Sequence, residues 1–337
     1  MKNWKKVGLT ALAGSLATTS AFAGAVTVSG VANLTYTANS GAEDTPLATN
    51  TGVGIDGSRW GLNKSLTFSG SGELDNGWTV SVSQTLADGS STGLGMTIDM
   101  GDMGTLNYEA DTGARGIGKI KDMMPTADED VGNGIDVDGS GTAGGLSGTV
   151  SGGTQGFHYS KALDMVEFGI GYAPKGGTGT GSGSVSGIGG AASNVSAFVK
   201  IDPMDGLEIG FGIGEKSTAT SGDAGLTDDH QTVYVTYVYG PLTAGYQLSN
   251  VDTTGSTADD EQTRWALLYA VNDEMSISYQ DHNNDDGTAT DEDATGWSAS
   301  YTSGGMTFKL HRNSADNVGN AVSKESEHTE VGVTFAF

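Results

Sequence analysis

Apolar and polar residues alternate with a period of two over many short stretches of this chain. The last stretch, residues 327–337, is the clearest, and its apolar residues share one face: Val331, Val333, Phe335 and Phe337. Such alternation predicts a β-strand with one apolar side. An apolar strand with an unpaired edge invites aggregation. Pairing with the first strand would close the sheet into a barrel whose apolar face points at lipid.

The same alternation, read together with the turns, predicts sixteen strands. Short turns alternate with longer loops, and strands of about ten residues suit a tilted crossing of a bilayer. An even number of strands places both chain ends on the periplasmic side. The predicted strands are residues 27–36, 62–70, 78–86, 94–100, 105–110, 154–162, 166–173, 194–201, 207–214, 230–239, 242–249, 262–270, 275–280, 296–301, 306–312 and 327–337.

The composition agrees with an all-β fold. The chain has 55 glycines and 5 prolines, and glycine is a poor helix former. We therefore predict a transmembrane antiparallel β-barrel of sixteen strands. A two-sheet sandwich is the alternative, but it would seldom need so many strands in one array.

The N-terminus carries an export signal. Lys2, Lys5 and Lys6 precede an apolar run over residues 7–16, and Ala21-Phe22-Ala23 follows with small residues at the positions that signal peptidase reads. A short anchor helix is the alternative, but the run is too short to span a bilayer. We assign residues 1–23 to a secretory signal peptide and residues 24–337 to the barrel domain.

Charge and cysteine content exclude several classes of protein. The net charge is −25 at pH 7, which argues against nucleic acid as a partner. No cysteine is present, so neither disulfides nor thiolate chemistry can occur. Neither a G-x-S-x-G motif nor a Walker loop is found. His158 and Ser160 share a strand face, as a barrel lipase would require, but a lumen-facing histidine is the favoured interpretation.

The chain resembles the general-diffusion porins of Gram-negative outer membranes. The matching features are the signal peptide, Gly72-Glu-Leu-Asp-Asn-Gly-Trp78, Gly101-Asp-Met-Gly-Thr-Leu106, a long non-alternating segment at residues 111–153 and the terminal Phe337. The resemblance implies a sixteen-stranded barrel, a homotrimer in the outer membrane, and a third loop (111–153) folded into the lumen. It also implies that Phe337 is the signal read by the barrel-assembly machinery.

In such a channel, charged residues at the constriction set the ion preference. The candidates on the third loop are Arg115, Lys119, Lys121, Asp122, Asp128, Glu129 and Asp130. The candidates on the barrel wall are Arg59, Asp99, Glu109 and Lys309. The alternation along their strands places Glu167 and Glu208 on the lumen-facing side as well. Basic wall residues are few, which departs from the family pattern. Lys64 departs further, because a regular strand would direct it at lipid, at a cost in mid-bilayer.

We expect passive diffusion of small hydrophilic solutes and ions, with a mild cation preference and no catalysis. No cofactor is expected, apart from Ca²⁺ bound by acidic loops. Asp281, Asn283, Asp285 and Glu292 echo a calcium-binding loop, although the glycine falls one place late, at Gly287. Such loops could also bridge to lipopolysaccharide through divalent ions. The alternative function is an exported calcium-binding adhesion protein without channel activity.

Overall fold

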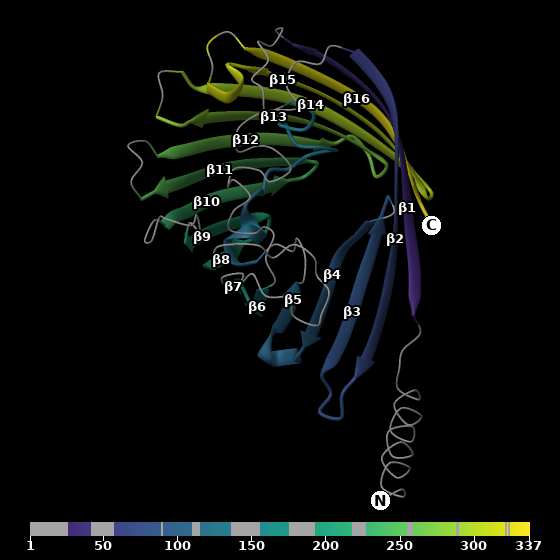
Figure 1. Cartoon of the computed structure of the whole chain (residues 1–337), viewed down its shortest axis with the longest axis vertical. Coiled ribbons are helices and arrows are strands. Elements are labelled where there is room, and N and C mark those ends of the chain that lie inside the picture. Colours follow the sequence, from purple (N-terminus) through teal and green to yellow (C-terminus); the bar gives the residue numbers. More distant parts are fainter. Residues whose placement is uncertain are drawn as a thin grey trace, which may run out of the picture.

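The computed structural model of the chain is a closed antiparallel β-barrel (Figure 1). The structure describes residues 26–41, 57–88, 90–109, 115–135, 156–174, 193–217, 227–254, 259–287, 290–320, 322 and 324–337. The assigned signal peptide, residues 111–114 and residues 136–153 lie outside this set. The strands are β1 (Thr27–Gly41), β2 (Gly57–Glu73), β3 (Thr79–Ala87), β4 (Ser90–Asp99), β5 (Thr105–Glu109), β6 (Gly156–Leu163), β7 (Val166–Ala173), β8 (Asn194–Met204), β9 (Leu207–Ser217), β10 (Thr227–Tyr239), β11 (Leu242–Thr253), β12 (Asp260–Ala270), β13 (Met275–Asp285), β14 (Glu292–Ser303), β15 (Met306–Asp316) and β16 (Glu325–Ala336).

The barrel closes through its first and last strands, as the sequence predicts. β1 pairs with β16 in a register that runs from Val31 opposite Ala336 to Gly41 opposite Ser326. Phe337 extends the ladder by donating from its N–H to the Gly30 carbonyl at 3.0 Å and accepting from the Gly30 N–H at 2.7 Å. Each other strand pairs with its neighbours in sequence. Closure satisfies the backbone groups that a lipid environment cannot.

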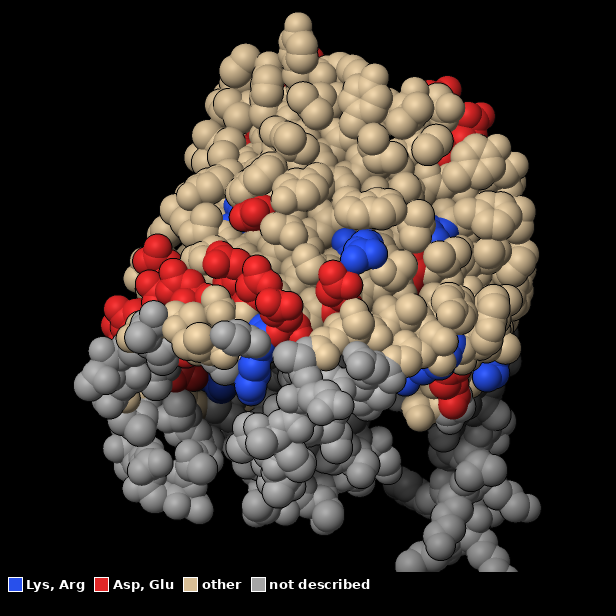
Figure 2. Space-filling view, turned by 90° about the horizontal axis from the view of Figure 1, so that it is seen from above, with Lys and Arg blue, Asp and Glu red and all other residues tan. Residues whose placement is uncertain are grey.

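Strand alternation sorts apolar residues to the outside of the barrel. On β16, Val331 and Phe335 are 49% and 45% exposed, whereas Gly332 between them is buried. Outward aromatic rings pack across strands, with Trp265 and Tyr279 centred 5.4 Å apart. Charged residues are sparse over a broad band of the face in Figure 2, and acids gather along its border with the residues drawn in grey. Within the described ranges, no helix is long and apolar enough to cross a membrane.

Several strands extend beyond their predicted ends. Residues 275–280 were expected for β13, which runs on to Asp285, and residues 62–70 for β2, which begins at Gly57. The residues added to β13 lack alternation because both of their faces are polar. They remain in the ladder nevertheless, as the pairing of Glu261 with Asp285 shows. Alternation marks the membrane-facing part of a strand, whereas hydrogen bonding continues past it.

The barrel wall is shorter along its axis on one side, because the strands there have fewer residues. β5 has 5 residues and β3 has 9, whereas β2 has 17. Pairing of β2 with β3 ends at Ser65 opposite Ala87, and the described part of β2 before Ser65 pairs with β1. Lys64 lies at this rim, where its N–H donates to Asp88 Oδ1 at 3.1 Å and its Nζ lies 3.5 Å from the same oxygen. The outward-facing Lys64 is therefore exposed but has a carboxylate beside it.

Candidate functional site

The segment of residues 115–135, here called the constriction segment, runs inside the ring of strands (Figure 1). It begins with a 3₁₀ helix, Gly116–Ile120. Gly116 N–H donates to His158 Nδ1 at 3.1 Å. Ile117 N–H donates to Ser196 Oγ at 3.3 Å, and the Ile117 and Ile120 side chains are fully buried against Phe198 and Tyr234 on the wall. The segment is therefore fixed to the barrel at its start.

Lumen-facing glycines allow the constriction segment to pack closely against the wall. A Cβ on Gly171 would lie 2.6 Å from Gly116 N, and one on Gly212 would lie 2.7 Å from Ile117 Cγ1. A Cβ on Gly245, further along, would lie 2.6 Å from Pro125 Cδ. Real Cβ atoms do not approach so closely, so these positions need glycine. Part of the high glycine content therefore serves the close approach of one backbone to another.

Side chains from the wall bind the middle of the segment. Gln247 on β11 donates from Nε2 to the carbonyls of Ile120 at 3.0 Å and Lys121 at 3.1 Å, and its Oε1 accepts from Met123 N–H at 3.0 Å. One amide thus satisfies three backbone groups that the barrel would otherwise bury unpaired.

The contacts of Asp128, which we call the latch, hold the C-terminal part of the constriction segment against the wall. Its carboxylate meets Lys309 Nζ and His311 Nδ1, the latter at 3.1 Å, and its N–H donates to Ser298 Oγ at 3.1 Å. Burial opposes ionisation of Asp128, but hydrogen bonds from His311 and Lys309 outweigh it and lower the pKa of this carboxyl. Asn313 donates to the carbonyls of Asp130 at 3.0 Å and Asn133 at 2.8 Å.

The predicted constriction residues divide into two groups. Arg115 is fully buried, and the Asp128 side chain is 2% exposed, so both face the wall rather than water. This corrects the expectation that they line the passage, because the acids and bases that fasten a loop must face its support. The other candidates keep contact with solvent: Lys119 and Glu129 are exposed, and Lys121, Asp122 and Asp130 are part-buried. We call these five residues the eyelet.

The predicted wall residues are spread along the barrel. Arg59 faces the lumen, since it pairs with Thr37, and is exposed. Asp99 accepts from Gly101 N–H at 2.9 Å at the end of β4, so it belongs to a turn. Glu109 pairs with Gly95 and Gly156, and its side chain lies outside the described set. Lys309 is held by Asp128.

The lumen face of β1–β5 is largely uncharged where it is described. Thr67 and Thr85 hydrogen-bond across strands at 2.8 Å, and Thr97 donates to Asn107 at 2.7 Å. Glu167 and Glu208, on the opposite side, contact Lys200 at 3.4 Å and the Tyr234 hydroxyl at 2.6 Å respectively.

Sequence reasoning missed the wall residues that contact the constriction segment. Arg264 on β12 lies 3.7 Å from Asp122, and Gln280 accepts from Val131 N–H at 2.9 Å. Glu330 on β16 faces the lumen, because it pairs with His311 and Thr37. The alternation of polar and apolar residues along these strands would have identified Arg264, Gln280 and Glu330, because each lies on the polar face.

The four expected calcium ligands do not form one group, which corrects that prediction. β13 runs straight through Asp281, Asn283 and Asp285, which lie on the outward face. Glu292 is fully buried on the other face of the sheet and accepts from Gly319 N–H. An extended strand cannot wrap its side chains around an ion as a loop does. Among the described residues, no group of three or more His, Cys, Asp or Glu has the geometry to hold a metal ion.

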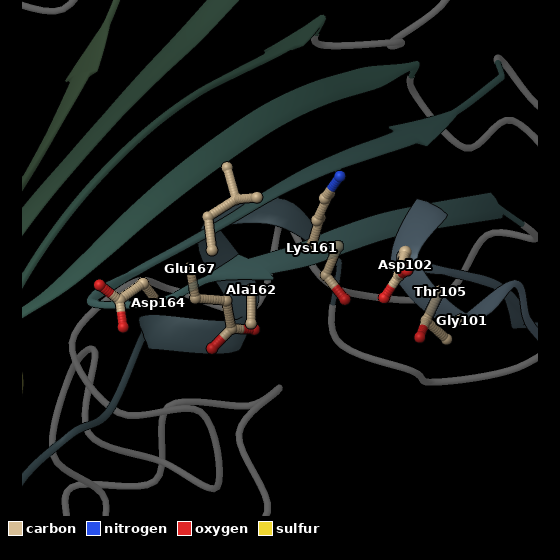
Figure 3. A pocket seen from close by; sticks show the side chains of 10 residues that line it. Gly101, Asp102, Thr105, Lys161, Ala162, Asp164 and Glu167 are labelled. Atoms are coloured by element: carbon tan, nitrogen blue, oxygen red, sulfur yellow. The ribbon is translucent and has the colours of Figure 1, made fainter.

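A separate cavity of about 600 Å³ lies at the short-turn end of the barrel (Figure 3). It is formed by the turn between β4 and β5 and the hairpin of β6 and β7, with Asp102, Lys161, Asp164 and Glu167 among its lining residues. Ser160 lines this cavity, whereas Nδ1 of His158 is taken by Gly116 and its ring stacks on Phe198. His158 therefore supports the constriction segment.

A closed barrel with an apolar exterior, a polar lumen and an internal loop is the architecture of an outer-membrane channel. The chain belongs to the Gram-negative porin family, whose family model matches residues 8–273. This family and the fold imply the outer membrane as its location.

Solved porins share the fold at low sequence identity. The anion-selective porin from Comamonas acidovorans is 14% identical, with a TM-score of 0.66 and coverage of 93% of this chain and 99% of that one. The outer-membrane OmpT of Vibrio cholerae is 12% identical, with a TM-score of 0.62 and coverage of 93% and 97%. A Rh. blastica porin mutant is 13% identical, with a TM-score of 0.61 and coverage of 93% and 100%. No match was found among curated protein sequences.

Proposed function

We propose that this protein, exported by residues 1–23, is a non-enzymatic channel for passive diffusion of small hydrophilic solutes and ions. The fastening of the constriction segment across the lumen is the observation that carries the proposal. Gln247, Gln280 and Asn313 hold its backbone, and Asp128 is latched to Lys309. A loop held in this way narrows the passage at a fixed place, so solutes are filtered by size and charge there.

We propose a mild preference for cations. Two basic wall groups are held by carboxylates, Arg264 by Asp122 and Lys309 by Asp128. Asp130 aside, the eyelet groups Lys119 and Lys121 are matched in number by Glu129 and by the lumen-facing Glu330 of β16. The acid surplus of the whole chain, net −25 at pH 7, favours cations at the mouths. The fold alone does not set the sign, since a porin with the same fold is anion-selective.

Liposome swelling tests the channel against the adhesion alternative. Liposomes containing the protein are expected to swell in small sugars at a rate that falls steeply with sugar size. An exported calcium-binding surface protein would leave them impermeable to every sugar. An inserted barrel that passes none contradicts the proposed function.

We propose a homotrimer in the membrane, with the low side of the barrel as its contact. Trp60 and Leu62, on the upper part of β2, are 71% and 61% exposed there. Such a contiguous apolar surface beside an unusually short wall suits contact with a second copy. The terminal Phe337 is proposed to be the signal for the barrel-assembly machinery.

Deletion of Phe337 is expected to reduce assembly of the folded barrel. The deletion removes two backbone hydrogen bonds to Gly30, each worth about 1 kcal/mol, and the ring that covers Gly30. The measurement is the fraction of heat-modifiable barrel on unboiled gels from cells and from refolding in detergent. Phe337→Tyr is the matched control and is expected to assemble normally. Equal assembly of the deletion in cells contradicts the signal role.

Lipopolysaccharide and divalent ions complete the proposed partners. Outward-facing acids lie directly opposite one another where β14, β15 and β16 meet: Asp293 pairs with Asp316, and Asp316 with Glu325. Like charges in such pairs are destabilising. Weak binding of Ca²⁺ or Mg²⁺ between them and lipid phosphates would offset this repulsion.

A further inference from the structure

The lumen wall that faces the constriction segment consists of small hydroxyl and amide side chains. β3 lies across the closed ring of strands from β11, which binds the middle of the segment (Figure 1). On the described parts of β2, β3 and β4, no charged side chain faces the lumen between Arg59 near the long-loop end and Glu73 and Asp99 at the short-turn end. The described lumen positions between them carry only serine, threonine, asparagine, glycine and alanine. We call this face of β2–β4 the hydroxyl wall.

Water reaches the hydroxyl wall but not the opposite side of the lumen. None of the described side chains on the lumen face of β2–β4 is buried, whereas Ser196, Gln247 and His311 are buried beneath the segment. Thr85 lies about as far from the short-turn end of β3 as Gln247 does from that end of β11, so the hydroxyl wall passes the segment at its own height. A solute that crosses the eyelet therefore moves between the segment and the hydroxyl wall.

The hydroxyls of this wall keep hydrogen-bonding capacity for a solute. The hydroxyl oxygens of Thr67 and Thr85 lie 2.8 Å apart, and Thr97 donates to Asn107 Oδ1 at 2.7 Å. A bonded pair of threonine hydroxyls uses one hydrogen and one lone pair, so the other hydrogen and the remaining lone pairs are left for other partners. Lumen positions repeat about every 6.6 Å along a strand and about every 4.8 Å across strands, which is comparable with the width of a sugar ring.

The charges around the passage do not build a strong field across it. On the segment side, Arg264 lies 3.7 Å from Asp122, and Lys309 is held by Asp128, so both basic groups are neutralised where they stand. The hydroxyl wall places no basic group opposite the segment. A field across a channel orients dipolar solutes. Without one, a zwitterion loses part of its hydration at the constriction and gains little in return, because charged groups are costly to desolvate.

We propose that the hydroxyl wall is the specificity-determining surface of the channel and that its preferred solutes are uncharged polyhydroxy compounds, namely sugars and sugar alcohols. This inference rests on the proposed channel function. As such a solute passes the segment, its hydroxyls exchange hydrogen bonds with water for hydrogen bonds with Thr67, Thr85 and Thr97. Each wall hydroxyl can donate or accept, so the preference is for a class of solutes rather than for one stereochemistry.

Removal of two wall hydroxyls tests the proposal. Valine keeps the branched shape and the strand preference of threonine but lacks its hydroxyl. The double variant Thr67→Val/Thr85→Val is expected to admit glucose into liposomes roughly three- to tenfold more slowly than the parent protein, which corresponds to the loss of about one net hydrogen bond. Its single-channel conductance in potassium chloride is expected to stay unchanged, because the width of the passage is preserved.

Thr302→Val/Thr307→Val is the matched control. These two hydroxyls are also paired across strands, 3.0 Å apart, but they lie at the short-turn end of β14 and β15. Glucose entry and conductance are expected to equal those of the parent. The inference is overturned if this control slows glucose as much as the wall variant does. It is also overturned if glucose entry in the wall variant is unchanged or falls only in proportion to conductance. Absence of conductance in the parent contradicts the channel function instead, so the two failures are distinguishable.

Interruptions of the ion current give a second readout that separates solute classes. A linear trisaccharide of glucose is expected to interrupt the potassium chloride current of the parent, with a residence time that shortens in Thr67→Val/Thr85→Val. A zwitterionic glycine peptide of similar length is expected to reside for less time than the trisaccharide. A peptide that resides as long as the sugar, or a trisaccharide residence time that is equal in the two proteins, overturns the proposal.

Discussion

Gly171→Ala is expected to enlarge the channel. The new Cβ would lie 2.6 Å from Gly116 N and 2.8 Å from Arg115 C, which are backbone atoms that cannot rotate away. The start of the constriction segment must therefore lift from the wall, with loss of the Gly116–His158 and Ile117–Ser196 hydrogen bonds. At about 1 kcal/mol each, their loss shifts the equilibrium between a segment bound to the wall and a segment detached from it by roughly thirtyfold. Single-channel conductance and the largest sugar that enters liposomes should both increase.

Gly332→Ala is the matched control. Gly332 also faces the lumen, from β16, but its nearest neighbour to a new Cβ is Thr35 Cγ2 at 3.4 Å, an ordinary contact. The same added methyl group should therefore leave conductance and size limit unchanged. If the two variants behave alike, residues 115–135 do not form the constriction.

Glu129→Lys is expected to convert the mild cation preference into an anion preference. Glu129 is the exposed acid of the constriction segment, and the charges around it nearly cancel. The substitution changes the eyelet by two charges. One charge acts on an ion about 4 Å away with about 1 kcal/mol even at the dielectric constant of water, so a change of two charges should alter the permeability ratio by roughly tenfold or more. The reversal potential under a salt gradient should change sign.

Asp128→Asn distinguishes an eyelet charge from a latch charge. Asp128 is buried against Lys309 and His311, so its loss should loosen the segment and raise conductance more than it alters ion preference.

An unchanged sign of the reversal potential in Glu129→Lys would show that the preference arises elsewhere in the lumen.

The fold was predictable because the membrane imposes a strict pattern. A strand that crosses lipid must alternate, and its edges must be paired, so Val331, Phe335 and the strands before them revealed their number, order and closure. Strand ends were less predictable. Beyond the membrane, Asp281 to Asp285 need no apolar face, so β13 continues without a signal in the sequence.

The site was predictable as a segment but not as a set of contacts. Charge and length mark the third loop, yet nothing local tells that Arg115 and Asp128 turn to the wall while Lys119 and Glu129 turn to water. That division depends on partners such as Gln247, more than a hundred residues away in sequence. The expected calcium loop was wrong because four acidic or amide residues at suggestive spacing also fit a polar strand extension.

Single-channel recording of the purified, refolded protein in a planar lipid bilayer under a salt gradient tests the central claim most directly. Stepwise openings with a reversal potential that favours cations are predicted, and openings that occur in threes would support the trimer. Anion preference would retain the channel and contradict its charge assignment. A fully inserted barrel without conductance would contradict the account.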